Sequence, residues 1–316
     1  MGVHLALTSG DPRGIGPEVA HRSLARLRRE SPHLDVRVFG PDGAESDDFL
    51  WQIREEAITR SDDDLWAGTI AGASIERAVE AALRGEIHGI VTGPLHKPSL
   101  HASGRHFPGQ TEMLAALAGV SRVGMLMVAE RTHLGAPLRV LLATTHLPLR
   151  DVPSTVTSEL LVDQVSLLRD ALVSDWALER PRIGVCALNP HASDGGLFGD
   201  EEDRIYRPAV EALIAGGVDV SGPIPADTVF RRTGAGEFDA VVAPYHDVGM
   251  AAFKTVSFGS GVNVTLGLPF VRTSPDHGTA FDIAGAGVAD DSSMIEALSL
   301  AHQLASSRFD TPSADV

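Results

Sequence analysis

Three histidines each follow an apolar run that has the length and composition of a buried strand. They are His146, His191 and His246, which follow the runs 140–143, 183–188 and 240–243. Ligands of open α/β sheets bind beyond the carboxyl ends of the strands, so three imidazoles at such ends could converge on one divalent metal. Neutral imidazole suits zinc, and a catalytic zinc keeps three protein ligands and one open position. The numbers of residues between the histidines are too large for a local metal-binding motif. The prediction of a metal site therefore rests on the repeated pattern of a strand end followed by a histidine.

Three further polar residues, Lys254, Asn263 and Arg272, lie in a region that is otherwise apolar and rich in glycine. A lysine and an arginine together can bind a phosphate or a carboxylate. Taken singly, each is more often a solvated side chain, and only the fold can bring the three together. The sequence therefore leaves both an anion site and solvent exposure open for these residues.

A glycine-rich stretch, residues 8–18, joins the first expected strand to the first expected helix. Such a turn can bring backbone N–H groups close to an anion. The stretch does not match the dinucleotide-binding fingerprint, because Val19 occupies the position of the third glycine, and it lacks the Gly-Lys-Ser/Thr of a Walker loop. A structural tight turn and a ligand-binding loop therefore both remain open.

Apolar strand-like runs alternate along the chain with segments of helical periodicity. This alternation predicts an α/β fold with a mostly parallel sheet. The expected strands are 3–8, 36–39, 88–91, 123–128, 138–143 and the runs that end at 188 and 243. The expected helices are 17–29, 69–84, 111–117, 157–172, 201–215 and 292–306.

Length and charge narrow the classes of protein to which the chain can belong. The 316 residues, 43% of them hydrophobic, are enough for a large core and favour two domains. The formal net charge of −16 argues against a nucleic-acid-binding surface but leaves room for a local basic pocket. The single cysteine, Cys186, excludes an intramolecular disulfide, and no apolar run approaches the ~20 residues that span a bilayer. With no signal peptide at the start, these features predict a cytoplasmic protein without membrane or nucleic-acid partners.

A second glycine-rich stretch, residues 277–287, begins His-Gly-Thr-Ala and continues Phe-Asp-Ile-Ala-Gly. It resembles the adenosine-binding loop of the isopropylmalate and isocitrate dehydrogenases. In that resemblance Gly278, Thr279 and Asp282 bind the cofactor. The Asp282 carboxylate would accept hydrogen bonds from free ribose hydroxyls, which selects NAD over NADP. The alternative is a helix N-terminus with Asp282 as a local cap.

Nine stretches in order along the chain resemble the 4-hydroxythreonine-4-phosphate dehydrogenase family. They are residues 10–18, 92–94, 145–150, 189–192, 225–228, 245–247, 261–269, 272–274 and 276–280. The resemblance covers nearly the whole chain. It implies a two-domain fold of the isocitrate and isopropylmalate dehydrogenase type, with α/β/α layers and an active-site cleft between the domains. The expected cofactor-binding domain is 1–118 plus 258–316, and the expected dimerisation and metal/substrate domain is 119–257.

The resemblance also implies site residues and an assembly. The family forms homodimers with shared active sites, in which His146 and His191 of one chain and His246 of the other hold the metal. The residues that match its substrate-binding positions are Gln110, Thr111, Lys254, Asn263 and Arg272. One of these departs from the family pattern: this chain has Gly-Gln-Thr-Glu where Gly-His-Thr-Glu is usual. Glutamine can still donate and accept hydrogen bonds but cannot become a cation near neutral pH.

The activity that the resemblance implies is metal-dependent, NAD-linked oxidation of a secondary alcohol on a small anionic substrate. That substrate is 4-phosphooxy-threonine, from pyridoxine biosynthesis, or a related four-carbon acid phosphate, and the β-keto acid product would lose carbon dioxide. Zinc is the expected metal, with magnesium, manganese and cobalt open. The candidate catalytic residues are Asp247 and Lys254, and Asp247 could be a general base, orient His246 or cap a helix. A cis-dihydrodiol dehydrogenase, a non-catalytic metal- and ligand-binding relative and an acyl- or phosphotransfer enzyme are the alternatives.

Overall fold

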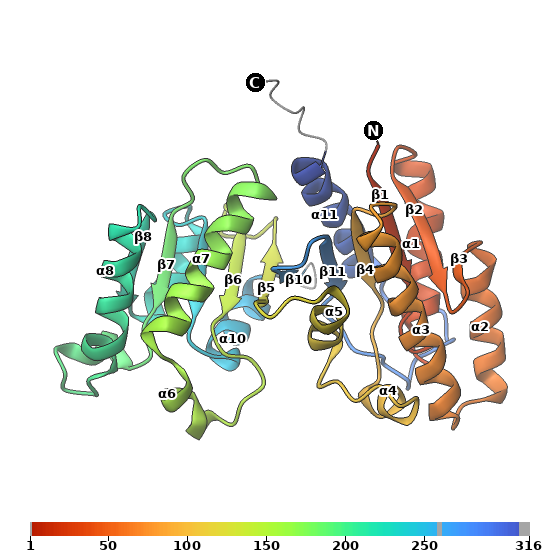
Figure 1. Ribbon diagram of the computed structural model, residues 1–316, viewed down its shortest axis with the longest axis horizontal. Helices are drawn as coiled ribbons and strands as arrows, with labels where there is room; N and C mark the ends of the chain where they lie inside the picture. Colours follow the sequence, from red (N-terminus) through yellow and green to blue (C-terminus); the bar gives the residue numbers. More distant parts are fainter. Residues whose placement is uncertain (1, 258–260, 310–316) are drawn as a thin grey trace. The chain divides into compact units, whose positions relative to one another are not determined.

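The computed structural model describes residues 2–257 and 261–309, and its chain divides into two compact units (Figure 1). Unit 1 comprises Met1–Val123 and Val262–Val316, and unit 2 comprises Gly124–Gly261. The boundary expected from the sequence at residue 258 lies outside the described residues. In the part of the chain that is described, no helix is both long enough and apolar enough to cross a membrane.

Unit 1 is built on a mostly parallel sheet in the order β3-β2-β1-β4-β11-β10. Its strands are β1 (His4–Thr8), β2 (Asp35–Gly40), β3 (Gly43–Glu45), β4 (Gly89–Thr92), β10 (Val262–Leu266) and β11 (Val271–Pro275). Strand β1 runs parallel to β2 and β4, and β11 runs parallel to β4, whereas β3 and β10 are antiparallel to their neighbours. Thr8 pairs with Thr92, so the loops that follow β1 and β4 leave the sheet at the same edge.

The described part of unit 1 contains six helices. They are α1 (Gly16–Glu30), α2 (Asp48–Thr59), α3 (Asp64–Leu83), α4 (Lys97–Ala102), α5 (Gln110–Ala118) and α11 (Ser292–Phe309). Pro17 occupies the first turn of α1, and the Asp63 side chain accepts the N–H of Trp66 at 2.8 Å to cap α3. Gly119 ends α5 in the left-handed conformation, at φ 68°. Buried Ile75, Ile90 and Met113, from α3, β4 and α5, belong to one apolar cluster that holds these helices on the sheet.

The strands of unit 2 follow one another in the order β5-β6-β9-β7-β8. Its strands are β5 (Gly124–Ala129), β6 (Leu138–Leu142), β7 (Ile183–Cys186), β8 (Val220–Ile224) and β9 (Ala240–Ala243). Strands β6, β9, β7 and β8 are parallel, and only β5 is antiparallel to its neighbour. Leu142 pairs with Ala243 and Val185 pairs with Val242, so the carboxyl ends of β6, β9 and β7 meet at one edge.

The helices of unit 2 are α6 (Val152–Thr155), α7 (Ser158–Ser174), α8 (Arg207–Ala215), α9 (Ala226–Gly234) and α10 (His246–Ser257), with short turns at Leu149–Asp151, Pro190–Asp194 and Glu202–Tyr206. Helices α7 and α8 contact each other, and α9 and α10 both pack on β6 and β9. Buried Val140, Val241 and Phe253 lie in the cluster between sheet and helices. The predicted α/β fold with mostly parallel strands is therefore confirmed.

Candidate functional site

The three strand-end histidines of unit 2 leave neighbouring parallel strands at the same edge of the sheet. His146 follows β6, His246 follows β9 and His191 follows β7, and these strands lie in the order β6-β9-β7. The rings of His146 and His246 lie side by side, with their centroids 5.5 Å apart. The predicted context, a strand end followed by histidine, is thus present for all three residues, and two of the imidazoles are in contact within one chain.

Asp247 is bonded to the ring of the preceding histidine. His246 Nδ1 and Asp247 Oδ1 lie 2.7 Å apart, and the carboxylate is 86% exposed in the first turn of α10. Because α10 begins at His246, Asp247 is a residue of the helix and not its cap. A carboxylate on Nδ1 fixes the ring and leaves Nε2 for a metal, which is the arrangement usual for metal-binding histidines.

His191 lies in a turn of unusual backbone conformation. His191, Ala192, Ser193 and Asp194 have φ angles of 54°, 54°, 65° and 46°, so four consecutive non-glycine residues are left-handed. Each such residue costs about 1–2 kcal/mol relative to the right-handed conformation. Backbone strain of this kind persists only where surrounding contacts impose it, and it concentrates at functional sites.

The three histidines do not form a complete metal cluster within one chain. Across residues 2–257 and 261–309, no group of three His, Cys, Asp or Glu side chains is placed to hold a metal ion. The rings of His146 and His246 are neighbours within one chain. The resemblance implies that His246 of a second chain completes a site formed by His146 and His191, and this division of the ligands stays a prediction.

The candidate substrate residues of unit 1 are organised around a fully buried cation, Arg272. Its Nη1 donates to Thr265 Oγ1 at 3.0 Å, and its Nη2 donates to Thr92 Oγ1 at 2.7 Å. Its Nε is buried without a hydrogen-bond partner among the described residues. Burial lowers the pKa of Arg272 to about 10, and the charge of Glu112 opposes this shift only in part. A guanidinium that stays charged at neutral pH with unfilled bonding capacity is suited to bind an anion.

Gln110, the first residue of α5, is bonded directly to this arginine. Its Oε1 accepts from Arg272 Nη2 at 3.2 Å, and its Nε2 donates to the Gly93 carbonyl at 3.0 Å. The side chain therefore connects α5, the loop after β4 and the buried cation. Asn263 on β10 also has a buried Oδ1 without a hydrogen-bond partner in the part of the chain described. Lys254, expected from the same sequence region, lies exposed in the last turn of α10 in unit 2.

The two glycine-rich stretches of unit 1 touch each other. The Ile15 N–H donates to the Thr279 carbonyl at 2.9 Å, and the Gly285 N–H donates to Glu18 Oε2 at 3.0 Å. A Cβ on Gly14 would lie 2.6 Å from the Thr279 carbonyl oxygen, so only glycine permits this approach. Asp282 is exposed in a turn, and the next helix begins at Ser292, so the helix-cap alternative for Asp282 is wrong.

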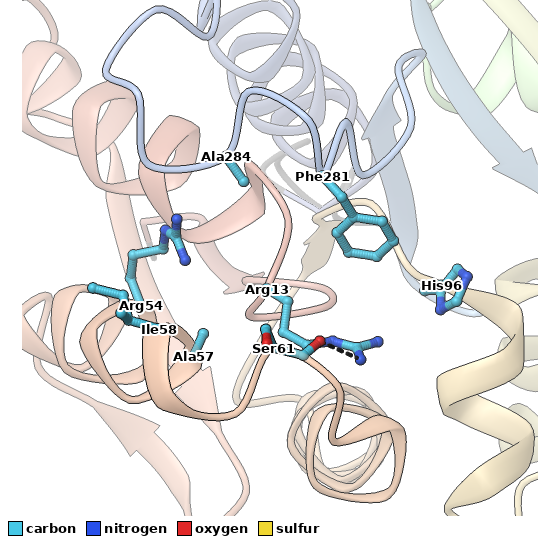
Figure 2. A pocket seen from close by; sticks show the side chains of 8 residues that line it. All are labelled: Arg13, Arg54, Ala57, Ile58, Ser61, His96, Phe281 and Ala284. Atoms are coloured by element: carbon cyan, nitrogen blue, oxygen red, sulfur yellow. Dashed lines mark hydrogen bonds between the residues drawn. The ribbon is translucent and has the colours of Figure 1, made fainter.

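A pocket of about 480 Å³ lies beside the 277–287 loop (Figure 2). Its lining residues are Arg13, Arg54, Ala57, Ile58, Ser61, His96, Phe281 and Ala284. The Phe281 ring is 42% exposed, lies 5.1 Å from the His96 ring in an edge-on arrangement, and has the Arg13 guanidinium 5.5 Å from its centroid. An exposed aromatic ring at the edge of a concave pocket can stack against a planar ligand.

Arg13 is held by carboxylates that the sequence did not reveal as partners. Its Nη2 donates to Asp11 at 3.0 Å, to Asp64 at 2.7 Å and to Ser99 at 2.6 Å. These contacts raise the pKa of Arg13, chiefly through the hydrogen bond to Asp11, and Arg13 in turn lowers the pKa of Asp64. The network joins the first glycine-rich turn to α3 and α4, so this turn has a structural role. Asp64 and Ser99 are far from Arg13 in sequence, and only the fold identifies them.

Comparison with known proteins identifies the family. The family model described as "Pyridoxal phosphate biosynthetic protein PdxA" matches residues 22–301. The chain is 41% identical over 318 residues to the 4-hydroxythreonine-4-phosphate dehydrogenase of Paracoccus denitrificans, with 96% of this chain and 98% of the relative covered. It is 44% identical over 333 residues to the D-threonate 4-phosphate dehydrogenase of Cupriavidus necator, with coverage of 96% and 98%.

Solved structures agree with this assignment. The 4-hydroxythreonine-4-phosphate dehydrogenase of Klebsiella pneumoniae matches with a TM-score of 0.82 and 36% identity, over 96% of this chain and 100% of that chain. The isocitrate dehydrogenase of Methylococcus capsulatus, at 14% identity and a TM-score of 0.54, covers 95% of this chain and 84% of that one and shares the fold alone. The predicted fold type is thereby confirmed. The chain belongs to the PdxA family and is an oxidoreductase of that family.

Proposed function

We propose that this protein is a metal-dependent, NAD-linked dehydrogenase that oxidises the secondary alcohol of a small phosphorylated four-carbon acid. The observation that carries the proposal is Arg272, a fully buried cation with an unpartnered Nε and no carboxylate among its hydrogen-bond partners. Burying a charge without a counter-ion is costly, and an anionic ligand would offset that cost. The names of the Paracoccus, Cupriavidus and Klebsiella relatives support a phosphorylated substrate.

In unit 1, Arg272 would bind the anionic end of the substrate, with Gln110, Thr111 and Asn263 as neighbouring polar groups. The buried Oδ1 of Asn263 supports this role because it has an unused acceptor among the described residues. The cofactor would lie along the 277–287 loop. Gly278 and Thr279 would contact it, and the Asp282 carboxylate would accept hydrogen bonds from its ribose hydroxyls. The pocket lined by Phe281 fits this placement, because an exposed ring beside the loop can stack on adenine.

In unit 2, His146, His191 and His246 would hold the metal, for which zinc is the first candidate and magnesium, manganese and cobalt are the others. The His246–Asp247 contact supports this role, since it leaves Nε2 for the metal and assigns Asp247 to orienting the ring. The ammonium group of Lys254 would attract the anionic substrate. A metal held by these histidines would supply Lewis acidity toward the oxygen atoms of the substrate, and NAD bound by unit 1 would supply the hydride acceptor.

The assembly that we propose is a homodimer whose metal sites contain residues of both chains. Large apolar side chains are exposed beside two of the histidines: Leu149 is 64% exposed near His146, and Leu197 and Phe198 are 72% and 47% exposed near His191. Exposed apolar groups of this kind mark surfaces that a partner covers. A second copy of the chain would bury them and complete the ligand set.

An NADH-release assay tests the proposed function. The purified protein, loaded in turn with zinc, magnesium, manganese or cobalt, is supplied with NAD and with 4-phosphooxy-threonine, D-threonate 4-phosphate or a cis-dihydrodiol. We expect metal-dependent NADH formation with a phosphorylated acid and none with the dihydrodiol. Turnover of the dihydrodiol alone would favour the dihydrodiol dehydrogenase. The absence of NAD binding with every metal would refute the dehydrogenase proposal.

Gln110→His is expected to make substrate binding dependent on pH. A histidine at this position can become a cation beside Arg272, so binding of a phosphate should tighten as the pH falls toward about 6, where imidazole is protonated. An added charge of this kind is worth roughly 1 kcal/mol, or about fivefold in KM. The measurement is KM between about pH 8 and pH 6, expressed as the ratio of variant to wild type so that titration of the substrate cancels. A ratio that does not change with pH would contradict a contact between residue 110 and the substrate.

A further inference from the structure

The strained turn that carries His191 is attached to a buried carboxylate, Glu202. The Glu202 side chain is fully buried, with 0% exposure. One of its oxygens, Oε1, accepts the backbone N–H of Leu188 at 2.9 Å and that of Asn189 at 2.7 Å. The other, Oε2, accepts from Asn189 Nδ2 at 2.9 Å. Among the described residues, Glu202 forms no ion pair, so these N–H groups are what compensates its burial.

Asn189 links this carboxylate to the turn. Its carbonyl accepts the N–H of Ala192 at 3.2 Å, which closes the left-handed turn around His191. Its side-chain amide lies 2.7 Å from the position that a Cβ on Gly199 would occupy, and Gly199 has a φ of +134°. Glycine at 199 therefore lets the amide reach both Glu202 and Glu201, whose Oε2 accepts from Nδ2 at 2.7 Å. A continuous set of contacts runs from Glu202 through Asn189 to the backbone of His191.

The local structure around Glu202 is itself uncommon. Residues Glu202–Tyr206 form a π-helical turn before α8. Such turns are rare and occur frequently at functional sites. The turn places the Glu202 carboxylate inward, against the end of β7, where the apolar run alone would leave the N–H groups of Leu188 and Asn189 without partners. An acidic residue is thus buried where it accepts N–H groups that an apolar side chain would leave unpaired.

We propose that Glu202 is a positioning residue: through Asn189 it holds the left-handed turn that presents His191 to a divalent cation. The inference rests on the proposed metal-binding role of His191. The carboxylate does not touch the metal. It fixes the backbone on which the imidazole is carried, so that the imidazole need not be ordered when the cation binds. Pre-ordering of a ligand raises affinity by reducing the cost of binding.

Glu202→Gln tests this role, with Glu211→Gln, at an exposed acidic residue of α8, as the matched control. Glutamine keeps the size of the side chain but replaces one acceptor by an NH₂ group, which cannot accept from Asn189. Zinc affinity of the metal-free protein, measured by calorimetry, should fall about 10- to 100-fold in Glu202→Gln. In Glu211→Gln, which removes the same charge away from Asn189, it should stay within about threefold of wild type. Hydrogen exchange of the amides between residues 192 and 198 should accelerate in the metal-free Glu202→Gln protein and not in the control.

A second change should rescue the first. Asn189→Asp in a background with both Glu201→Gln and Glu202→Gln offers its carboxylate to the two new NH₂ groups, and zinc affinity should recover at least threefold relative to that background. A general loss of stability in the background would not be restored by this change. If Glu202→Gln does not fold, Asn189→Ala replaces it and should show the same fall in affinity. Wild-type zinc affinity in whichever variant folds overturns the role of Glu202. His191→Ala separates this outcome from failure of the metal proposal itself. Zinc binding unchanged in His191→Ala would refute the ligand and with it the role of Glu202, whereas loss of zinc binding in His191→Ala beside wild-type affinity in Glu202→Gln would refute the role of Glu202 alone.

Discussion

Replacement of Arg272 by methionine is expected to abolish substrate binding while leaving the fold as stable as before. Burial lowers the pKa of Arg272 from 12.5 to about 10, which corresponds to roughly 3 kcal/mol of unfavourable free energy for the charged form. Methionine removes that cost but also removes three hydrogen bonds, to Thr265, Thr92 and Gln110, each worth about 1 kcal/mol. The two effects nearly cancel in the free energy of unfolding. Substrate affinity should fall by a factor of 100 or more, since a hydrogen-bonded charge pair is worth about 3 kcal/mol.

Arg139→Met is the matched control for stability. Arg139 is also a buried strand residue, but its Nη2 is paired with Glu130 at 2.8 Å. Methionine there leaves the carboxylate without its partner, so Tm should fall by several degrees. Calorimetric titration with the phosphorylated substrate and thermal unfolding of both variants give the comparison. A fall in Tm for Arg272→Met as large as for Arg139→Met would show that the arginine is needed for folding, and retained substrate affinity would remove it from the site.

The position of the three histidines after strand ends was predictable because short apolar runs in the sequence mark those strands. Apolar runs of four to six residues predicted strands, and the structure confirms that β6, β9 and β7 are parallel neighbours whose ends meet. Two elements that the sequence analysis did not predict, β8 and α4, lack such a pattern. Strand β8 contains Gly222 and Pro223, which are unfavourable in strands, and α4 is a single short helix that begins at Lys97-Pro98. Helix α10 begins with the polar pair His246-Asp247, and only Pro244 and Tyr245 separate it from β9.

The contacts within the site could not be predicted, for a different reason. Arg272 forms hydrogen bonds with Thr92 and Gln110, which are 180 and 162 residues away in the sequence. No local sequence rule pairs residues at such separations. The polar residues Lys254, Asn263 and Arg272 were grouped only by their closeness in sequence. The structure places Lys254 in unit 2 and the other two in unit 1. The backbone conformation of His191 also has no sequence signature, since none of the four left-handed residues is glycine.

Loss of the His191 side chain should remove both the metal and the activity without unfolding the chain. His191 is exposed, so His191→Ala deletes little packing, and alanine in the left-handed conformation carries the same backbone strain. We expect zinc content below about one tenth of wild type after dialysis, and turnover reduced roughly 1000-fold or more, because a catalytic metal supplies several kcal/mol. His133→Ala is the control. His133 is also an exposed histidine of unit 2, on the loop between β5 and β6, at the opposite edge of the sheet. Full activity with unchanged metal content in His191→Ala would refute the proposed ligand set.

Mixed dimers then decide how the three ligands are divided between the chains. The structure brings His146 and His246 of one chain into contact, with ring centroids 5.5 Å apart, whereas the family resemblance groups His146 with His191. Co-expression of a His146→Ala chain with a His246→Ala chain separates these arrangements. If His146 and His246 act from one chain, each mutant breaks that pair and no intact site forms. If they act from different chains, half of the randomly assorted dimers are mixed and each contains one intact site, so about a quarter of wild-type activity returns. We expect the recovery of about a quarter that the family resemblance implies, and no recovery would assign His146 and His246 to one chain. The mixture of His191→Ala with His246→Ala is the positive control, because each mixed dimer keeps one intact site under either division.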